Sequence, residues 1–76
     1  MNKNLYEGYV INDDGASITL PRTTSIQKIE KFARSHYGKG WVCHINKLFV
    51  DNESGWLMQD IFGNTSEEIK KFKIRF

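Results

Sequence analysis

The spacing of apolar and polar side chains predicts a β-hairpin over residues 5–20. Residues 16–20 alternate apolar and polar side chains, and residues 8–11 share the period of two, which is typical of half-buried strands. The segment Asn-Asp-Asp-Gly at 12–15 lies between them, and Asp-Gly favours a hairpin turn because both residues tolerate positive φ. Pro21 is expected to end the second strand, since proline cannot donate to the ladder.

One helix is predicted over about residues 25–37, where apolar side chains recur at helical spacing. Thr24 with Gln27 fits a capping box, and Ser25 is an alternative N-cap. Glycines soon after residue 37 are expected to end the helix, because glycine readily adopts the left-handed conformation found at many helix ends. The residues expected on the inner face of this helix are Ile26, Ile29, Phe32, Ala33 and His36.

Residues 41–50 have the character of a strand, in which alternate side chains share a face. Trp41, Cys43 and Ile45 form the apolar face, and the alternation breaks at the dipeptide 46–47. We predict a tight turn at that dipeptide, with a β-bulge that resets the register as the alternative.

Two further strands are predicted in the last third of the chain. Residues 56–62 are expected to form one strand, and Thr65 with Glu68 to cap a short helix. The end of the chain alternates apolar with basic residues, which favours a strand because helical spacing would scatter the apolar side chains around the axis. Phe72, Ile74 and Phe76 would form the apolar face of that strand, and Lys71, Lys73 and Arg75 the basic face.

Together these elements predict an α+β fold. It has an N-terminal β-hairpin, one amphipathic helix packed on a mostly antiparallel sheet of four or five strands, and a C-terminal strand. The 76 residues are expected to form one compact domain over residues 1–76. Cys43 is the only cysteine, so no disulfide can form within the chain.

The sequence also predicts where the protein acts. No apolar run approaches the roughly 20 residues that span a bilayer, and the first residues lack an apolar signal core. A lone thiol fits a reducing compartment. We therefore expect a cytoplasmic protein with no membrane partner.

Candidate catalytic and metal-binding residues are few. Cys43 and His44 are adjacent, but neighbours on a strand point to opposite faces, so this imidazole would not reach the thiol. His36 adds a third metal-ligand candidate, whereas structural zinc takes four ligands. The glycines around Lys39 follow a helix, where the helix dipole disfavours phosphate. The sequence therefore predicts no enzyme, no metal and no cofactor.

Charge is segregated along the chain, although the formal net charge is only +2. Residues 21–47 carry six cations and one anion, a local balance of +5. Residues 1–20 sum to −2, residues 48–68 to −5 and residues 69–76 to +4. Blocks of one sign create local fields that select partners, so this pattern predicts binding rather than chemistry.

We predict two kinds of partner, a protein and, as the alternative, a nucleic acid. Hydroxyls and free amides at the start of the helix suit a phosphate oxygen. The helix and the C-terminal strand would present one basic surface if they adjoin. The predicted contacts are Arg22, Thr24, Lys28, Lys31, Arg34, Lys39, Lys71, Lys73 and Arg75.

A protein partner is the function that we favour, because alternating acidic and basic surfaces suit complementary docking, whereas the −5 block would repel a polyanion. Trp56 is a predicted aromatic anchor, with core packing as an equal alternative. Small proteins rich in lysine, asparagine and isoleucine are similar in type to phage or mobile-element accessory proteins. The expected role is a non-catalytic, stoichiometric inhibitor of a bacterial defence or nucleic-acid-processing complex. A homodimer formed through a sheet edge is compatible with either partner.

Overall fold

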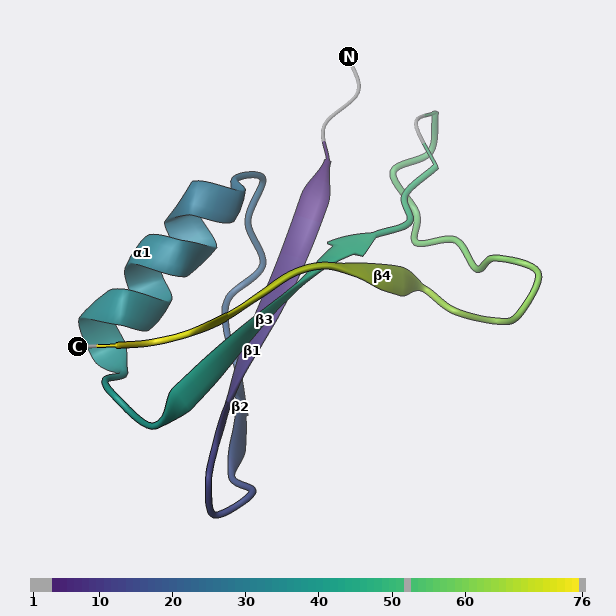
Figure 1. Ribbon diagram of the computed structural model, residues 1–76. Helices are drawn as coiled ribbons and strands as arrows, with labels where there is room; N and C mark the ends of the chain where they lie inside the picture. Colours follow the sequence, from purple (N-terminus) through teal and green to yellow (C-terminus); the bar gives the residue numbers. More distant parts are fainter. Residues whose placement is uncertain (1–3, 52, 76) are drawn as a thin grey trace.

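The computed structural model, which describes residues 4–51 and 53–75, has one helix packed against a four-stranded antiparallel sheet (Figure 1). The sheet order is β2-β1-β3-β4, so β2 and β4 are its edge strands. This arrangement confirms the predicted α+β fold, the N-terminal hairpin and the C-terminal strand. The elements are β1 (Leu5–Asn12), β2 (Ser17–Thr19), α1 (Ile26–His36), β3 (Trp41–Leu48) and β4 (Ser66–Lys73).

The turn between β1 and β2 has the positive-φ glycine that its sequence predicts, together with side-chain hydrogen bonds to its backbone. Gly15 has φ +86°, in the left-handed region where glycine has no Cβ penalty. The side chain of Asn12 accepts the backbone N–H groups of Asp14 and Ala16 at 3.0 and 2.9 Å. These bonds satisfy the amides of the turn and fix the pairing of β1 with β2.

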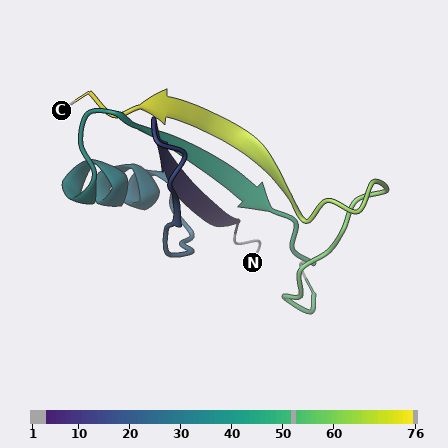
Figure 2. The ribbon, with the colours of Figure 1, turned by 90° about the horizontal axis from the view of Figure 1, so that it is seen from below.

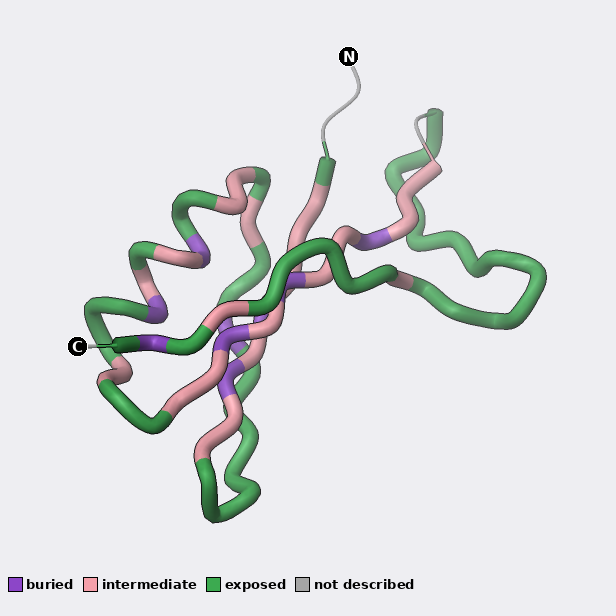
Figure 3. Tube along the Cα trace, viewed as in Figure 1, coloured by how far each residue is buried: buried purple, intermediate pink, exposed green. Residues whose placement is uncertain are grey.

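Helix α1 covers one face of β1 and β3 and encloses the core (Figure 3). Ser25 occupies the N-cap position without a side-chain hydrogen bond, so the capping box predicted at Thr24 is wrong. The hydroxyl of Thr23 accepts the Ser25 N–H at 3.2 Å instead, which holds the chain just before the helix. The buried core consists of Val10, Leu20, Ile29, Ala33, Cys43, Ile45 and Ile74.

At Gly8 of β1, the sheet lies close against the helix residue Ile29. A Cβ atom at this position would lie 2.7 Å from Cγ2 of Ile29 and 3.2 Å from the carbonyl oxygen of His44. The absence of a side chain at Gly8 therefore makes room for Ile29, which is 2 % exposed.

Strand β3 continues through residues 46–47, so the tight turn predicted there is wrong. The register shift does occur at this point: Ile45 pairs with Lys70, whereas Asn46 pairs with Glu68. The extra residue is Ile69, on the partner strand β4. The bulge therefore resides in β4, and β3 remains fully paired with β1 on its other side.

The described residues between β3 and β4, 49–51 and 53–65, form a long loop that projects from the sheet (Figure 2). The strand predicted over 56–62 is wrong, because among the described residues this segment has only an isolated bridge, between Leu57 and Val50. The helix start predicted at Thr65 is also wrong, since β4 begins at the next residue. Residues 66–68 pair with β3 instead of starting a helix.

At the end of the chain, buried or half-buried apolar side chains alternate with exposed basic side chains, as predicted. Phe72 is half-buried against the core and Ile74 is buried, whereas Lys71, Lys73 and Arg75 are exposed. Phe76, the last residue of the predicted apolar face, lies outside the described residues. Among the described residues, no helix has the length and apolar character needed to cross a membrane.

Candidate functional site

The predicted basic surface does not include Arg22 in the structure. Arg22 Nε donates to Glu7 Oε2 at 2.8 Å. Glu7 alternates along β1 with Gly8 and Val10, which face the helix, so this ion pair lies on the opposite side of the sheet. Arg22 therefore points away from the cations of α1.

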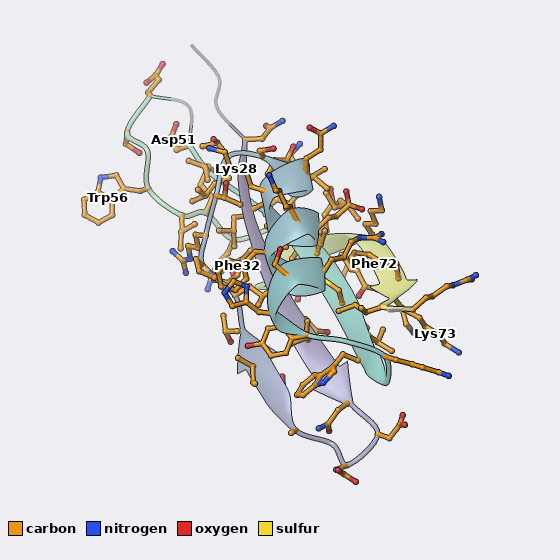
Figure 4. All side chains as sticks on the ribbon, turned by 90° about the vertical axis from the view of Figure 1, so that its left-hand side faces the viewer. Lys28, Phe32, Asp51, Trp56, Phe72 and Lys73 are labelled. Atoms are coloured by element: carbon orange, nitrogen blue, oxygen red, sulfur yellow. The ribbon has the colours of Figure 1, made fainter. Side chains whose placement is uncertain are left out.

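The cations of α1 line two different hollows, and Figure 4 shows Lys28 and Phe32 on the side of the helix away from Phe72 and Lys73. Lys28 and Lys31 line a shallow hollow with Phe32 and His36, whose rings stack with centroids 4.0 Å apart. This flank faces away from β4. Thr24 is exposed just before the helix, at the Lys28 end. These three predicted contacts lie apart from the cations of β4.

Arg34 lies on the flank of α1 that adjoins β4. Its guanidinium is 4.8 Å from the ring centroid of Phe72, which is within the range of a cation–π contact. A hollow of about 500 Å³ opens beside this contact. It is lined by Arg34, Val42, Lys71, Phe72, Lys73 and Arg75.

A second hollow of about 460 Å³ shares Val42, Lys73 and Arg75 with the first and extends past Lys39 and Trp41. We call the two together the basic groove. Of the three predicted cations on α1, Arg34 is the one that lines the basic groove. The cations of the basic groove are Arg34, Lys39, Lys71, Lys73 and Arg75.

Internal carboxylates neutralise cations outside the basic groove. Lys70 pairs with Glu30 of α1, and Arg22 pairs with Glu7. In the described part of the chain, none of the five groove cations belongs to such a pair. Among the described residues that line the groove, Asp13 is the one with a carboxylate. The groove therefore keeps a net positive charge.

The loop of residues 49–65 exposes most of the large apolar side chains on the surface. We call it the apolar loop. Ile61 is 92 % exposed, Phe62 82 % and Trp56 76 %, and Figure 4 shows Trp56 pointing away from the body of the protein. Leu57 and Met58 are exposed as well. The structure thus excludes the core alternative for Trp56.

Two aspartates hold the apolar loop in shape. Asp51 accepts the N–H of Glu53 and the hydroxyl of Ser54, each at 3.0 Å. Asp60 Oδ1 accepts the N–H groups of Phe62 and Asn64 at 2.8 and 2.9 Å. Each carboxylate closes a tight turn, so the apolar side chains are presented by an ordered backbone.

These hydrogen bonds lower the pKa of both carboxyls. The bond from the Glu53 N–H lowers the pKa of Asp51 most, and the bond from the Asn64 N–H lowers the pKa of Asp60 most. Because each folded pKa lies below its ordinary value of 3.8, the turns keep their full stability above that value. They lose it as the pH falls through the depressed pKa.

Titration of the Asp60 side-chain carboxyl by NMR is expected to give a midpoint below 3.8. The amide signals of Phe62 and Asn64 should move toward random-coil positions over the same pH interval. Asp60→Ala should show those random-coil positions at neutral pH, with the Asp51 turn unaffected. A midpoint at 3.8 or higher would show that Asp60 does not hold the turn.

The side chains of Cys43 and His44 lie on opposite faces of the sheet. Burial, with a smaller effect of the Glu30 carboxylate, raises the pKa of the Cys43 thiol to about 11, against the lowering effect of Arg34. His44 stacks on Tyr9 with centroids 4.6 Å apart and is hydrogen-bonded to Glu68. The two residues therefore do not form a nucleophile–base pair. The part of the chain that the structure describes contains no cluster of three metal-ligating side chains.

Sequence reasoning identified Trp56 but missed the other apolar side chains of the loop. A signal was present, because Asp51 and Gly55 precede the apolar segment, Asp60 interrupts it and Gly63 follows it. Turn residues on both sides of a short apolar segment favour a loop over a strand. No protein-family model, curated protein or solved structure matches the chain.

Proposed function

We propose that this protein is a non-catalytic binding protein that docks on another protein through the apolar loop. The observation that carries the proposal is the exposure of five large apolar side chains on one ordered loop: Trp56, Leu57, Met58, Ile61 and Phe62. A concentration of exposed apolar side chains on one segment is a feature of interaction sites in soluble proteins. A stoichiometric inhibitor needs no more than such a surface.

The shape of the loop favours tight binding. Aromatic and aliphatic side chains that enter a pocket of the partner dominate the energetics of most interfaces. The turns closed by Asp51 and Asp60 limit the conformational entropy that binding removes. The loop therefore has both the anchors and the preorganisation of a docking element.

The negative charge around the apolar loop indicates which kind of partner surface would complement it. No lysine or arginine occurs between residues 48 and 69, and residues 48–68 carry five carboxylates. An apolar pocket with a rim of lysine or arginine is the complementary surface. A symmetric contact between two copies would bring the acidic loops together, so we infer a different protein as the partner.

Photo-crosslinking tests this proposal. A benzophenone amino acid in place of Phe62 is expected to give a discrete adduct in a nuclease-treated bacterial extract, and the purified partner should bind with one-to-one stoichiometry. The same amino acid in place of Ser35, exposed on α1, is the matched control. The same adducts from both positions, or an adduct of twice the mass of this chain, would contradict the proposal.

A further inference from the structure

The backbone segments that carry Lys39, Lys73 and Arg75 of the basic groove lie at the opposite end of the sheet from the apolar loop (Figure 1). The cations of the groove come from three parts of the chain: Arg34 from α1, Lys39 from the connection to β3, and Lys71, Lys73 and Arg75 from the end of β4 and the residues after it. We propose that the basic groove binds the sugar–phosphate backbone of single-stranded nucleic acid.

The cations of β4 form a regular row. Alternate residues of a strand point to the same side about 7 Å apart, which places Lys71 and Lys73 in line, with Arg75 continuing the alternation. Arg34 lines the same hollow from the helix side. Lys71 and Lys73, in contrast, pair with His44 and Val42 and project from the other face of β4, so the hollow lies around the free edge of this strand. A row of evenly spaced cations on an extended strand complements the repeating charge of an extended polyanion.

Apolar surface beside this row favours a nucleic acid over other polyanions. Phe72 and Val42 line the first hollow, and Trp41 lines the second. Proteins that bind single strands combine a positive groove with aromatic side chains that contact the bases. Bases are available for such contacts in a single strand, whereas a duplex stacks them inside. A flexible strand can also follow a recessed groove.

Fluorescence anisotropy with a labelled single-stranded oligothymidylate tests the inference. About four phosphate contacts predict an affinity that falls about fifty-fold between 50 and 200 mM salt. The Lys71→Gln/Lys73→Gln variant should bind at least about tenfold more weakly at 50 mM salt. Lys28→Gln/Lys31→Gln removes the same charge from the other flank of α1 and should bind like the wild type.

Several results of the anisotropy experiment would contradict binding of single-stranded nucleic acid in the basic groove. Absence of binding at 50 mM salt, or equal weakening by both double variants, would overturn the inference. Displacement by polyglutamate as effective as by unlabelled oligonucleotide would assign the groove to acidic proteins instead. Circular dichroism verifies folding; if Lys71→Gln/Lys73→Gln does not fold, Lys39→Gln/Arg75→Gln, outside the regular strands, takes its place. Variants of the apolar loop should bind the oligonucleotide normally, which separates this test from that of the proposed protein partner.

Discussion

The Ile61→Ser/Phe62→Ser variant is expected to fold like the wild-type protein and to bind its protein partner at least about thirty-fold more weakly. Both side chains are almost fully exposed, so the folded state gains little from them. Surface substitutions of this kind change stability by about 0.5 kcal/mol or less. In the complex, however, the same side chains would be the anchors that fill the partner's pocket.

Isothermal titration with the partner identified by crosslinking measures the affinity, and urea unfolding measures the stability. Ile18→Ser is the matched control, because Ile18 is also an exposed isoleucine but lies on β2. It should leave the affinity unchanged. If Ile61→Ser/Phe62→Ser binds as tightly as the wild type, the apolar loop is not the docking element.

Gly8→Ala is expected to destabilise the protein by about 1–3 kcal/mol, which lowers Tm by roughly 5–20 °C in a domain of this size. Alanine reduces the entropy of the unfolded chain and would otherwise stabilise a strand by about 0.5–1 kcal/mol. The steric effect outweighs this gain, because the added methyl group would meet Ile29 at 2.7 Å. Ile29 is stiff and buried, so it cannot move aside.

A double-mutant cycle identifies the contact. In an Ile29→Ala background, Gly8→Ala should be less destabilising than in the wild type, because Cγ2 is gone, with a coupling energy of about 0.5–3 kcal/mol. Ile29→Val retains Cγ2 and should give no relief. Equal destabilisation in all three backgrounds would instead assign the clash to the carbonyl oxygen of His44, 3.2 Å away.

The elements predicted correctly are those with a regular pattern and a local cause. The hairpin has Asp14-Gly15 at its turn, α1 has apolar residues at helical spacing, and residues 72–75 alternate strictly. In each case the residue propensities, the spacing of the apolar residues and their burial all favour the same element. A segment is predictable when these independent features agree.

The apolar loop was predicted as a strand because exposure cannot be deduced from apolar character. Trp56, Ile61 and Phe62 would suit a core, but the sheet offers them no neighbouring surface. The bulge that the sequence offered as the alternative to a turn at 46–47 does occur, but its extra residue, Ile69, could not be located from the sequence. The break in alternation was visible in β3, whereas the extra residue that accommodates it lies in β4.

The candidate site was only partly predictable, because its composition depends on contacts between distant residues. Glu7 pairs with Arg22, 15 residues away, and Glu30 with Lys70. Neither pairing follows from local spacing. The division of the helical cations depends likewise on which flank of α1 adjoins β4, and this is set by the sheet order.

The length of β4 has a consequence for how the two ends of the molecule respond to charge. The strand starts at Ser66 and reaches Lys71, the groove cation nearest the apolar loop, after about 17 Å. The Debye length at physiological ionic strength is about 8 Å. A ligand at either end therefore experiences the field of that end alone. Both ends can be occupied at once without electrostatic interference, which would let one small chain bridge an anionic polymer and a cationic protein surface.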